Sequence, residues 1–240
     1  MKEFKLIRSK ASSARNNMAL DENIYYQYLK DGVGVLRLYR WEKPSFTYGF
    51  SQDPVNQIDL ALCAENGVQI AKRITGGGIL FHHDEITYSF VCNKSDIKEP
   101  ESVFVSYRNI CAFLLKFYQS LGLKPLFALE SENFKIRSLP SQFCSAAYEK
   151  YDILLRAKKI GGNAQKRNRQ AIFQHGSIPC SIDWDFMARH LKSLPTDTAD
   201  HITSLSAELK VIPEKDLLEE KLIEAFESSF GVRFYETCMA

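Results

Sequence analysis

The chain has 240 residues, of which 45% are hydrophobic, and a formal net charge of +2 at pH 7. That hydrophobic content allows a substantial core and argues against disorder along the whole chain. The nearly neutral charge argues against nucleic acid as the main partner, and no apolar run reaches the roughly 20 residues of a membrane span. Residues 1–5 lack the pattern of a signal peptide, so we expect a cytoplasmic protein without a membrane segment.

Helices and strands are expected to be interleaved through the first half of the chain. Apolar residues recur at helical spacing in residues 16–31 and again in residues 102–121, whereas residues 85–91 alternate as a half-buried strand does. The elements expected in chain order are a helix over 16–31, a strand over 35–41, a helix over 60–66, a strand over 68–73, a strand over 85–91 and a helix over 102–121.

The second half of the chain continues this mixture. Strands are expected over residues 151–155 and 171–175, and a helix is expected to begin near Ser181 or Asp183. A last helix over residues 214–229 ends before a glycine. The strands and helices do not alternate regularly, as they would around a parallel sheet. The sequence therefore predicts an α+β fold with a central mixed or antiparallel sheet flanked by helices.

Two phrases, one in each half of the chain, combine basic residues with glycine. The first covers residues 72–82 and contains three consecutive glycines, and the second covers residues 158–165. Glycine lets a backbone approach a ligand and present its N–H groups. Lysine and arginine supply charge for a phosphate or a carboxylate. The two phrases predict an anionic ligand, such as an adenylate, held between two loops of one fold.

In these phrases the chain resembles the lipoate-protein ligases, a family related to biotin ligases and octanoyl transferases. The first phrase is similar to the family's Arg-Arg-x-Thr-Gly-Gly-Gly-x-Val-x-His signature, and the second is similar to its Lys-Ile-x-Gly-x-Ala segment. Lys72 stands in place of the first arginine, which keeps the charge but loses a bidentate fork. Further matches are residues 17–22, Trp41, Pro44, Gly49, Gln52, residues 174–177 and residues 203–205.

The resemblance implies a particular domain organisation. We expect the fold of a class II synthetase or biotin-ligase-like catalytic domain, with its central sheet and flanking helices, over residues 1–210. Residues 211–240 are expected to form a C-terminal helical extension, without the separate accessory domain that larger ligases of the family carry.

The resemblance also implies which residues form the site. Lys159, at the head of the second glycine loop, is the expected catalytic residue and is implied to contact the acyl carbonyl and phosphate of an activated intermediate. Asp152 stands where ligases place an aspartate near the phosphate or Mg²⁺, although a purely structural charge at the start of a strand stays open. The residues expected to bind the substrate or its adenylate are Arg73, Thr75, Gly76, Gly77, Gly78, His82, Asp152, Gly161, Gly162 and Ala164.

The six cysteines lack the spacing of a metal site, and most are expected to be small buried residues. Adjacent His82 and His83 would point to opposite faces of a strand, so no shared metal site is expected there either. Cys144 is different, because some octanoyl transferases carry a nucleophilic cysteine at the same spacing before the acidic residue of this strand. Lys159 would favour its thiolate. Those transferases usually have arginine where this chain has Gly78, which favours a ligase.

We therefore expect an enzyme that attaches lipoate to a lysine of a lipoyl carrier domain, with ATP and Mg²⁺ first forming a lipoyl-adenylate. The expected partners are apo lipoyl domains of 2-oxoacid dehydrogenase complexes or a glycine cleavage H-type protein, with lipoate or octanoate as the small molecule. Two alternatives stay open. One is an octanoyl or lipoyl transferase that uses Cys144 as a thioester nucleophile, and the other is a catalytically silent protein that binds lipoyl domains.

Overall fold

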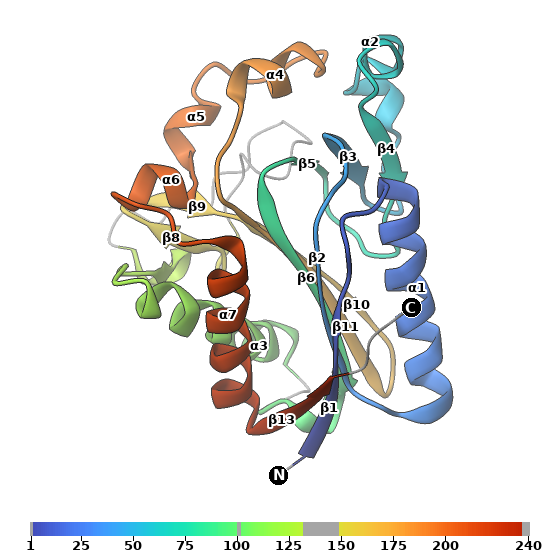
Figure 1. Ribbon diagram of the computed structural model, residues 1–240, viewed down its shortest axis with the longest axis vertical. Coiled ribbons are helices and arrows are strands. Elements are labelled where there is room, and N and C mark those ends of the chain that lie inside the picture. The colour runs from blue at the N-terminus through green and yellow to red at the C-terminus, as the bar shows by residue number, and fades with distance from the viewer. Residues whose placement is uncertain (1, 100–101, 132–148, 237–240) are drawn as a thin grey trace.

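A six-stranded sheet runs through the centre of the molecule (Figure 1). The computed structural model describes residues 2–99, 102–131 and 149–236. In chain order, the strands of this sheet are β1 (Lys2–Arg8), β2 (Val35–Tyr39), β6 (Glu85–Asn93), β10 (Gly162–Arg167), β11 (Ala171–Pro179) and β13 (Val232–Glu236).

The central sheet is mixed, with the strand order β10-β11-β6-β2-β1-β13. β1 runs parallel to both β2 and β13, whereas β2, β6, β11 and β10 follow one another through antiparallel pairs. Residues 2–6 pair with residues 232–236, so segments from opposite ends of the chain close one edge of the sheet. The predicted α+β fold with a mixed sheet is confirmed, although the sequence pattern predicted neither β1 nor β13.

Helices cover both faces of this sheet. α3 (Val103–Ser120) and α7 (Lys215–Phe230) pack together on one face, and α1 (Ala14–Asp31) lies on the other (Figure 1). Side chains alternate between the two cores, so that Phe4 of β1 packs under α3 and α7 whereas Ile7 packs under α1. Within the described part of the chain, no helix combines the length and the apolar character needed to cross a bilayer.

Two smaller sheets carry the glycine phrases. The first contains β4 (Gln69–Lys72), β3 (Ser45–Tyr48) and β5 (Ile79–His82), in that order. The second contains β12 (Ile202–Thr203), β9 (Lys158–Ile160), β8 (Ile153–Leu155) and β7 (Leu126–Phe127). The remaining elements are the helices α2 (Leu60–Glu65), α4 (Trp184–Arg189), α5 (Thr198–His201) and α6 (Leu205–Glu208), and 3-10 turns at Pro54–Asn56, Lys94–Asp96 and Ala128–Glu130.

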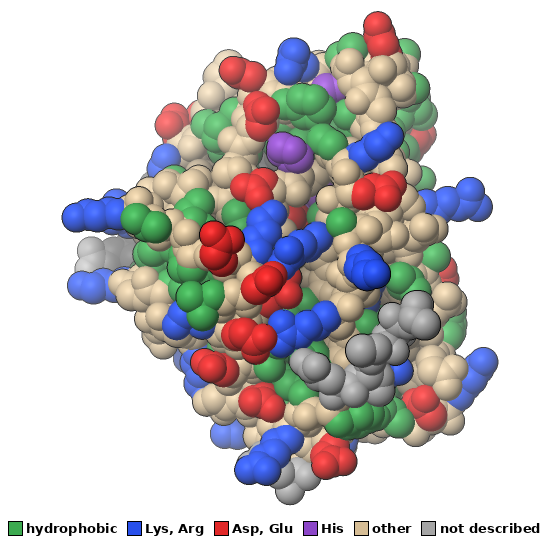
Figure 2. Space-filling view, in the orientation of Figure 1, with side chains coloured by type: hydrophobic (Ala, Val, Ile, Leu, Met, Phe, Trp, Pro, Cys, Tyr) green, Lys and Arg blue, Asp and Glu red, His purple; other side chains and the backbone are tan. Residues whose placement is uncertain are grey.

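Ion pairs tie α7 to neighbouring segments on the face shown in Figure 2. Arg8 pairs with Glu220 at 2.6 Å, and Arg40 pairs with Asp216 at 2.6 Å and with Glu219 at 2.8 Å. Basic and acidic side chains therefore lie beside one another across the middle of this face (Figure 2). The exposed pairs of Arg8 with Glu220 and of Arg40 with Asp216 contribute little stability individually, but the pairs leave this face without a patch of one sign.

A buried guanidinium joins α1 to the central sheet. Arg37 of β2 has a side chain that is 0% exposed, and its Nη1 lies 2.7 Å from Asp21 Oδ1. Its Nη2 donates to Asn17 Oδ1 at 2.7 Å and its Nε donates to Ser9 Oγ at 3.0 Å. Asp21 Oδ1 also accepts a hydrogen bond from the Ser89 hydroxyl at 2.7 Å. A buried charge is tolerated here because each guanidinium nitrogen has an acceptor.

We predict that Arg37→Met lowers the free energy of unfolding by about 3–5 kcal/mol, because removal of one partner leaves the Asp21 carboxylate buried without its cation. The double variant Arg37→Met/Asp21→Asn should recover part of this loss, since a neutral amide still accepts hydrogen bonds. Urea denaturation at pH 7 measures both variants. A double variant that is no more stable than the single one would show that the ion pair is not the source of the loss.

Candidate active site

Gly161 alone joins β9 to β10 and makes the turn of the second glycine phrase. Its φ is +73°, and a Cβ atom there would lie 2.1 Å from the carbonyl oxygen of Ser177. Both the backbone conformation and the lack of space exclude other residues. The turn therefore lies directly against β11, which fixes the position of the strand end that carries Lys159.

Lys159 is buried on β9, with an exposed fraction of 3%. Its Nζ lies 2.8 Å from Asp152 Oδ2. The backbone N–H of Glu149 donates to the same carboxylate oxygen at 2.8 Å. The structure thus brings the predicted lysine and the predicted aspartate into contact, and it places Lys159 on a strand rather than in a loop. Asp152 holds the ammonium group in one place, as a buried partner does.

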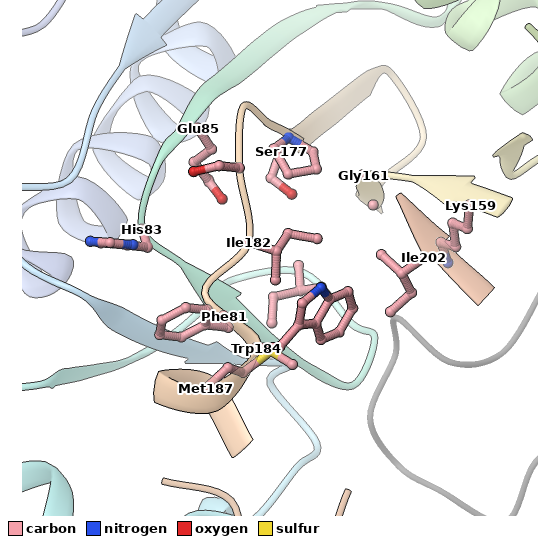
Figure 3. Close-up of a pocket in the computed structure, with 14 residues that line it drawn as sticks. Phe81, His83, Glu85, Lys159, Gly161, Ser177, Ile182, Trp184, Met187 and Ile202 are labelled. Atoms are coloured by element: carbon pink, nitrogen blue, oxygen red, sulfur yellow. The ribbon is translucent and has the colours of Figure 1, made fainter. Parts of the chain in front are cut away.

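Lys159 and Gly161 line one side of a pocket, and Phe81 and His83 line the opposite side (Figure 3). The pocket holds about 570 Å³ of space without atoms, solvent at its mouth included. The lining combines apolar walls with the buried Lys159 and the buried Glu85, which suits a ligand that has an apolar chain and a polar reactive group. The other apolar residues of the lining are Leu80, Pro179, Ile182, Trp184, Met187 and Ile202.

Arg73 braces the first glycine phrase, where residues 73–78 form the loop from β4 to β5. The side chain is buried, and its Nη2 donates to the carbonyl oxygens of Gly76 at 3.2 Å and Gly78 at 2.7 Å. Its Nη1 donates to Thr47 Oγ1 at 2.7 Å. These contacts engage the guanidinium with the protein itself, so Arg73 fixes the shape of the loop.

The glycine loop also packs against the residue that follows β3. Gly77 has a φ of +91°, and a Cβ atom on Gly49 would lie 2.1 Å from the carbonyl oxygen of Gly77. Gly49 is part of the family resemblance, and the structure explains why glycine is required there, since a side chain would collide with the loop. Any side chain at Gly49 would push the loop away from β3.

His82 belongs to a buried polar group beneath the loop. Its ring nitrogens lie 2.6 Å from Thr47 Oγ1 and 2.9 Å from Glu85 Oε1. The ring stacks on Trp41, with centroids 4.1 Å apart, and Trp41 Nε1 donates to Glu85 Oε1 at 3.0 Å. The sequence pattern missed Thr47 and Glu85. The spacing of three residues between His82 and Glu85 was the available signal for the latter.

Thr75 connects the loop to the buried ion pair of α1 and β2. Thr75 Oγ1 lies 2.7 Å from His175 Nε2, and His175 Nδ1 lies 3.1 Å from Asp21 Oδ2. Burial lowers the pKa of His175 below its usual 6.5, the charge of Arg73 acts in the same direction, and Asp21 opposes both. A neutral His175 donates from Nδ1 to Asp21 and accepts the Thr75 hydroxyl at Nε2. The contacts of Arg37 thereby extend to the glycine loop.

The structure brings five of the twelve predicted residues to two adjoining cavities. Leu80 and Ser177 line both of them, so the cavities share a wall. Of the predicted residues, Lys159, Gly161 and Gly162 line the pocket of Figure 3, and Arg73 and His82 line the smaller inner cavity. The others lie elsewhere: Thr75, Gly77 and Gly78 in the loop, Gly76 on its outer side, Ala164 opposite His175 in the sheet, and Asp152 beside Lys159, while Cys144 lies outside the described residues.

The Asp152 carboxylate already has two partners within the protein. Magnesium requires several oxygen ligands in near-octahedral geometry, whereas the Asp152 carboxylate is engaged by the Lys159 ammonium and the Glu149 amide. Within residues 2–99, 102–131 and 149–236, no group of three His, Cys, Asp or Glu side chains could hold a metal ion. Since magnesium is usually held by one or two carboxylates together with waters and substrate phosphates, the assignment of Asp152 to the phosphate or Mg²⁺ stays a prediction.

We predict that His175 makes the protein less stable as the pH is lowered. Below about pH 6.5 the unfolded chain takes up a proton at this residue, whereas folded His175, with its lowered pKa, does not. Stability is therefore lost as pH falls from about 7 towards the folded pKa. Urea denaturation at pH 7.5 and 5.5 should show a smaller pH effect in His175→Gln than in the unchanged protein, whereas exposed His83→Gln should retain it. An equal pH effect in His175→Gln would contradict the assignment.

The sequence model described as Lipoyl protein ligase A/B catalytic domain matches residues 13–230 of the chain. Octanoyltransferase LipM of Brevibacillus brevis is 30% identical, with 96% of this chain and 87% of that protein covered. Octanoyltransferase LipM of Oceanobacillus iheyensis is 32% identical, with 95% of this chain and 84% of that protein covered.

Solved structures share the fold. Lipoate-protein ligase A bound with ATP has a TM-score of 0.79 and 24% identity, covering 99% of this chain and 90% of that one. Protein Ta0514 of T. acidophilum, solved with bound lipoic acid, has a TM-score of 0.78 and 23% identity, with the same coverage. At this identity the ligases are evidence for the fold alone.

The comparisons correct one expectation and confirm another. ATP-dependent attachment of lipoate through a lipoyl-adenylate is wrong as the main activity, because the relatives of 30–32% identity are octanoyltransferases. The glycine at position 78 was therefore a misleading signal for a ligase. The expected family is confirmed by the match over residues 13–230. The chain belongs to the lipoyl protein ligase A/B catalytic domain family.

Proposed function

We propose that this protein is an octanoyltransferase, which moves an octanoyl group from a thioester donor to a lysine of an apo lipoyl domain. The observation that carries the proposal is the 30–32% identity to octanoyltransferases over at least 93% of this chain. The proposed donor is octanoyl–acyl carrier protein. Since a thioester is already an activated acyl group, the reaction needs neither ATP nor Mg²⁺.

Four of the six cysteines have surroundings that make them poor nucleophiles. They are buried, and burial raises the thiol pKa to about 11 in Cys63 and Cys180, to about 12 in Cys111 and well above the usual range in Cys92. Because the thiolate is the reactive form, these four residues are unsuited to acyl transfer at neutral pH. We assign the nucleophile to Cys144, one of the two remaining cysteines.

In the proposed mechanism, the acyl group passes through a thioester on Cys144. The Cys144 thiolate attacks the carbonyl carbon of the donor thioester, the donor thiol leaves, and octanoyl-Cys144 forms. The amine of the acceptor lysine then attacks this thioester, the Cys144 thiolate leaves and takes the proton lost by the amine, and an amide remains. Lys159 supplies the positive charge that favours the thiolate and the developing oxyanion, and Asp152 keeps that charge in position.

In this proposal, the apolar walls of the pocket bind the acyl chain of the substrate. Phe81, Trp184 and Met187 line the pocket away from Lys159 (Figure 3). Burial of each methylene group against such walls contributes about 0.8 kcal/mol, so an unbranched acyl chain gains affinity with every carbon that enters. We therefore place the chain against these residues and its carbonyl carbon near Lys159.

We predict that Cys144→Ser abolishes transfer, since a serine hydroxyl is far less acidic than a thiol. The unchanged protein is incubated with octanoyl–acyl carrier protein without ATP and examined by intact-protein mass spectrometry, which should show an octanoyl adduct that hydroxylamine removes. Cys238→Ser is the matched control and should keep both the adduct and the activity. Substantial transfer by Cys144→Ser, or a strict requirement for ATP, would refute the proposed function.

We predict that Lys159→Met lowers kcat by about 10²–10³-fold, the usual effect of losing one group that stabilises an oxyanion. The variant should also be less stable, because Asp152 keeps a buried carboxylate without its cation. Lys159→Met/Asp152→Asn removes that carboxylate and should regain stability but not activity. Recovery of transfer in the double variant would mean that Lys159 only neutralises Asp152. Steady-state kinetics and urea denaturation separate the two effects.

A further inference from the structure

A third hollow lies on the outer side of the glycine loop, bordered by α1 and the end of β10. Lys72, Lys166 and Arg167 contribute cations to its wall, and Glu22 is the single carboxylate among its described lining residues. It holds about 960 Å³ of space without atoms, open solvent included. We call this hollow the basic groove, lined by Glu22, Phe50, residues 72–74, Gly76 and residues 165–167.

The two lysines of the basic groove are not neutralised by carboxylates of the described residues. Among the ion pairs of the described residues, none includes Lys72 or Lys166. The Lys166 ammonium instead lies 5.5 Å from the centre of the Tyr25 ring. The face shown in Figure 2 is the opposite case, since its arginines lie beside acidic residues. A hollow with walls of one sign concentrates an oppositely charged partner.

The basic groove also exposes an aromatic ring. Phe50 is 60% exposed and lines the groove beside Gly76. An exposed aromatic residue among cations is a common anchor in interfaces between proteins, because burial of the ring supplies affinity while the charges supply orientation and a faster encounter. The groove therefore has the composition of a docking surface for an acidic protein.

The separation along β10 between the pocket and the groove indicates which substrate docks in the groove. Gly162 lines the pocket that contains Lys159, and Lys166 lies four residues further along β10, about 13 Å away at the usual rise of a strand. An acceptor domain offers the amine of a lysine side chain and must bind closer to the pocket. A carrier protein instead presents its acyl group on a long flexible arm, joined to the protein through an anionic phosphodiester, and can dock further away.

We propose that the basic groove is the docking site for the acidic carrier protein that delivers the octanoyl thioester. Lys72 and Lys166 attract its acidic surface and the phosphodiester of its arm, and Phe50 packs against it. Arg73 lines both the groove and the inner cavity, and Leu80 and Ser177 line both that cavity and the pocket of Lys159, so the three hollows adjoin one another. This inference rests on the proposed transfer reaction and adds the surface that selects the donor.

The test compares two double variants of equal charge change. Lys72→Glu/Lys166→Glu reverses charge in the groove, and Lys10→Glu/Lys192→Glu reverses charge at exposed positions outside it. The donors are octanoyl–acyl carrier protein and octanoyl-pantetheine, which has the same thioester without the protein. For the groove variant we expect a KM for the carrier donor raised roughly tenfold or more, with kcat and the KM for octanoyl-pantetheine unchanged. The control variant should match the unchanged protein with both donors.

Three results would overturn the docking site: an unchanged KM for the carrier donor, an equal rise in the control variant, or a rise only in the KM for the apo lipoyl domain. Titration of acyl carrier protein by calorimetry tests the groove without catalysis. Its affinity should fall with added salt in the unchanged protein and respond less in the groove variant. Binding that depends on the groove, without transfer from either donor, would refute the proposed function and keep the docking site. Equal binding by both variants would refute the docking site alone.

Discussion

The position of the candidate site depends on the hydrogen bonds of the buried Arg37 guanidinium. A fully buried charge stays stable only while its acceptors remain in place, so Asp21 and Asn17 fix α1 against the sheet. Asp21 is also hydrogen-bonded to His175, and His175 is hydrogen-bonded to Thr75 of the glycine loop. A helix, a sheet and the glycine loop are therefore joined by one network of hydrogen bonds, which fixes the position of the loop.

The parts of the fold with a regular apolar period could be predicted from the sequence. α1, α3 and α7 each bury one face against the sheet, which leaves a helical pattern along many residues. β1 and β13 are short strands with irregularly spaced charged residues, and they depend on pairing between opposite ends of the chain, so nothing local identifies their partner. β9 has only three residues, which is too short for any period to place Lys159 on a strand.

The candidate site likewise contains residues that could be predicted from the sequence and residues that could not. The glycine phrases were found because a tight turn and its flanking cations are local features of the sequence. Asp21 and His175 are 154 residues apart, and their contact becomes visible only in three dimensions. The choice between ligase and transferase was wrong for a chemical reason, since both reactions need a fixed cation and a close backbone. Gly78 contributes a carbonyl acceptor to Arg73, which either chemistry can use.

The ribosome makes β13 after every other strand described, yet β13 completes the edge beside β1. Before it docks, β1 presents an unpaired row of backbone N–H and C=O groups next to the apolar side chains of Phe4 and Leu6, an edge of the kind that recruits other chains. Pairing between such distant segments is also slow, because the entropy of closing a long loop is lost first. The nascent protein thus passes through a stage in which every strand around Lys159 has been synthesised while the β1 edge of the central sheet is open to aggregation.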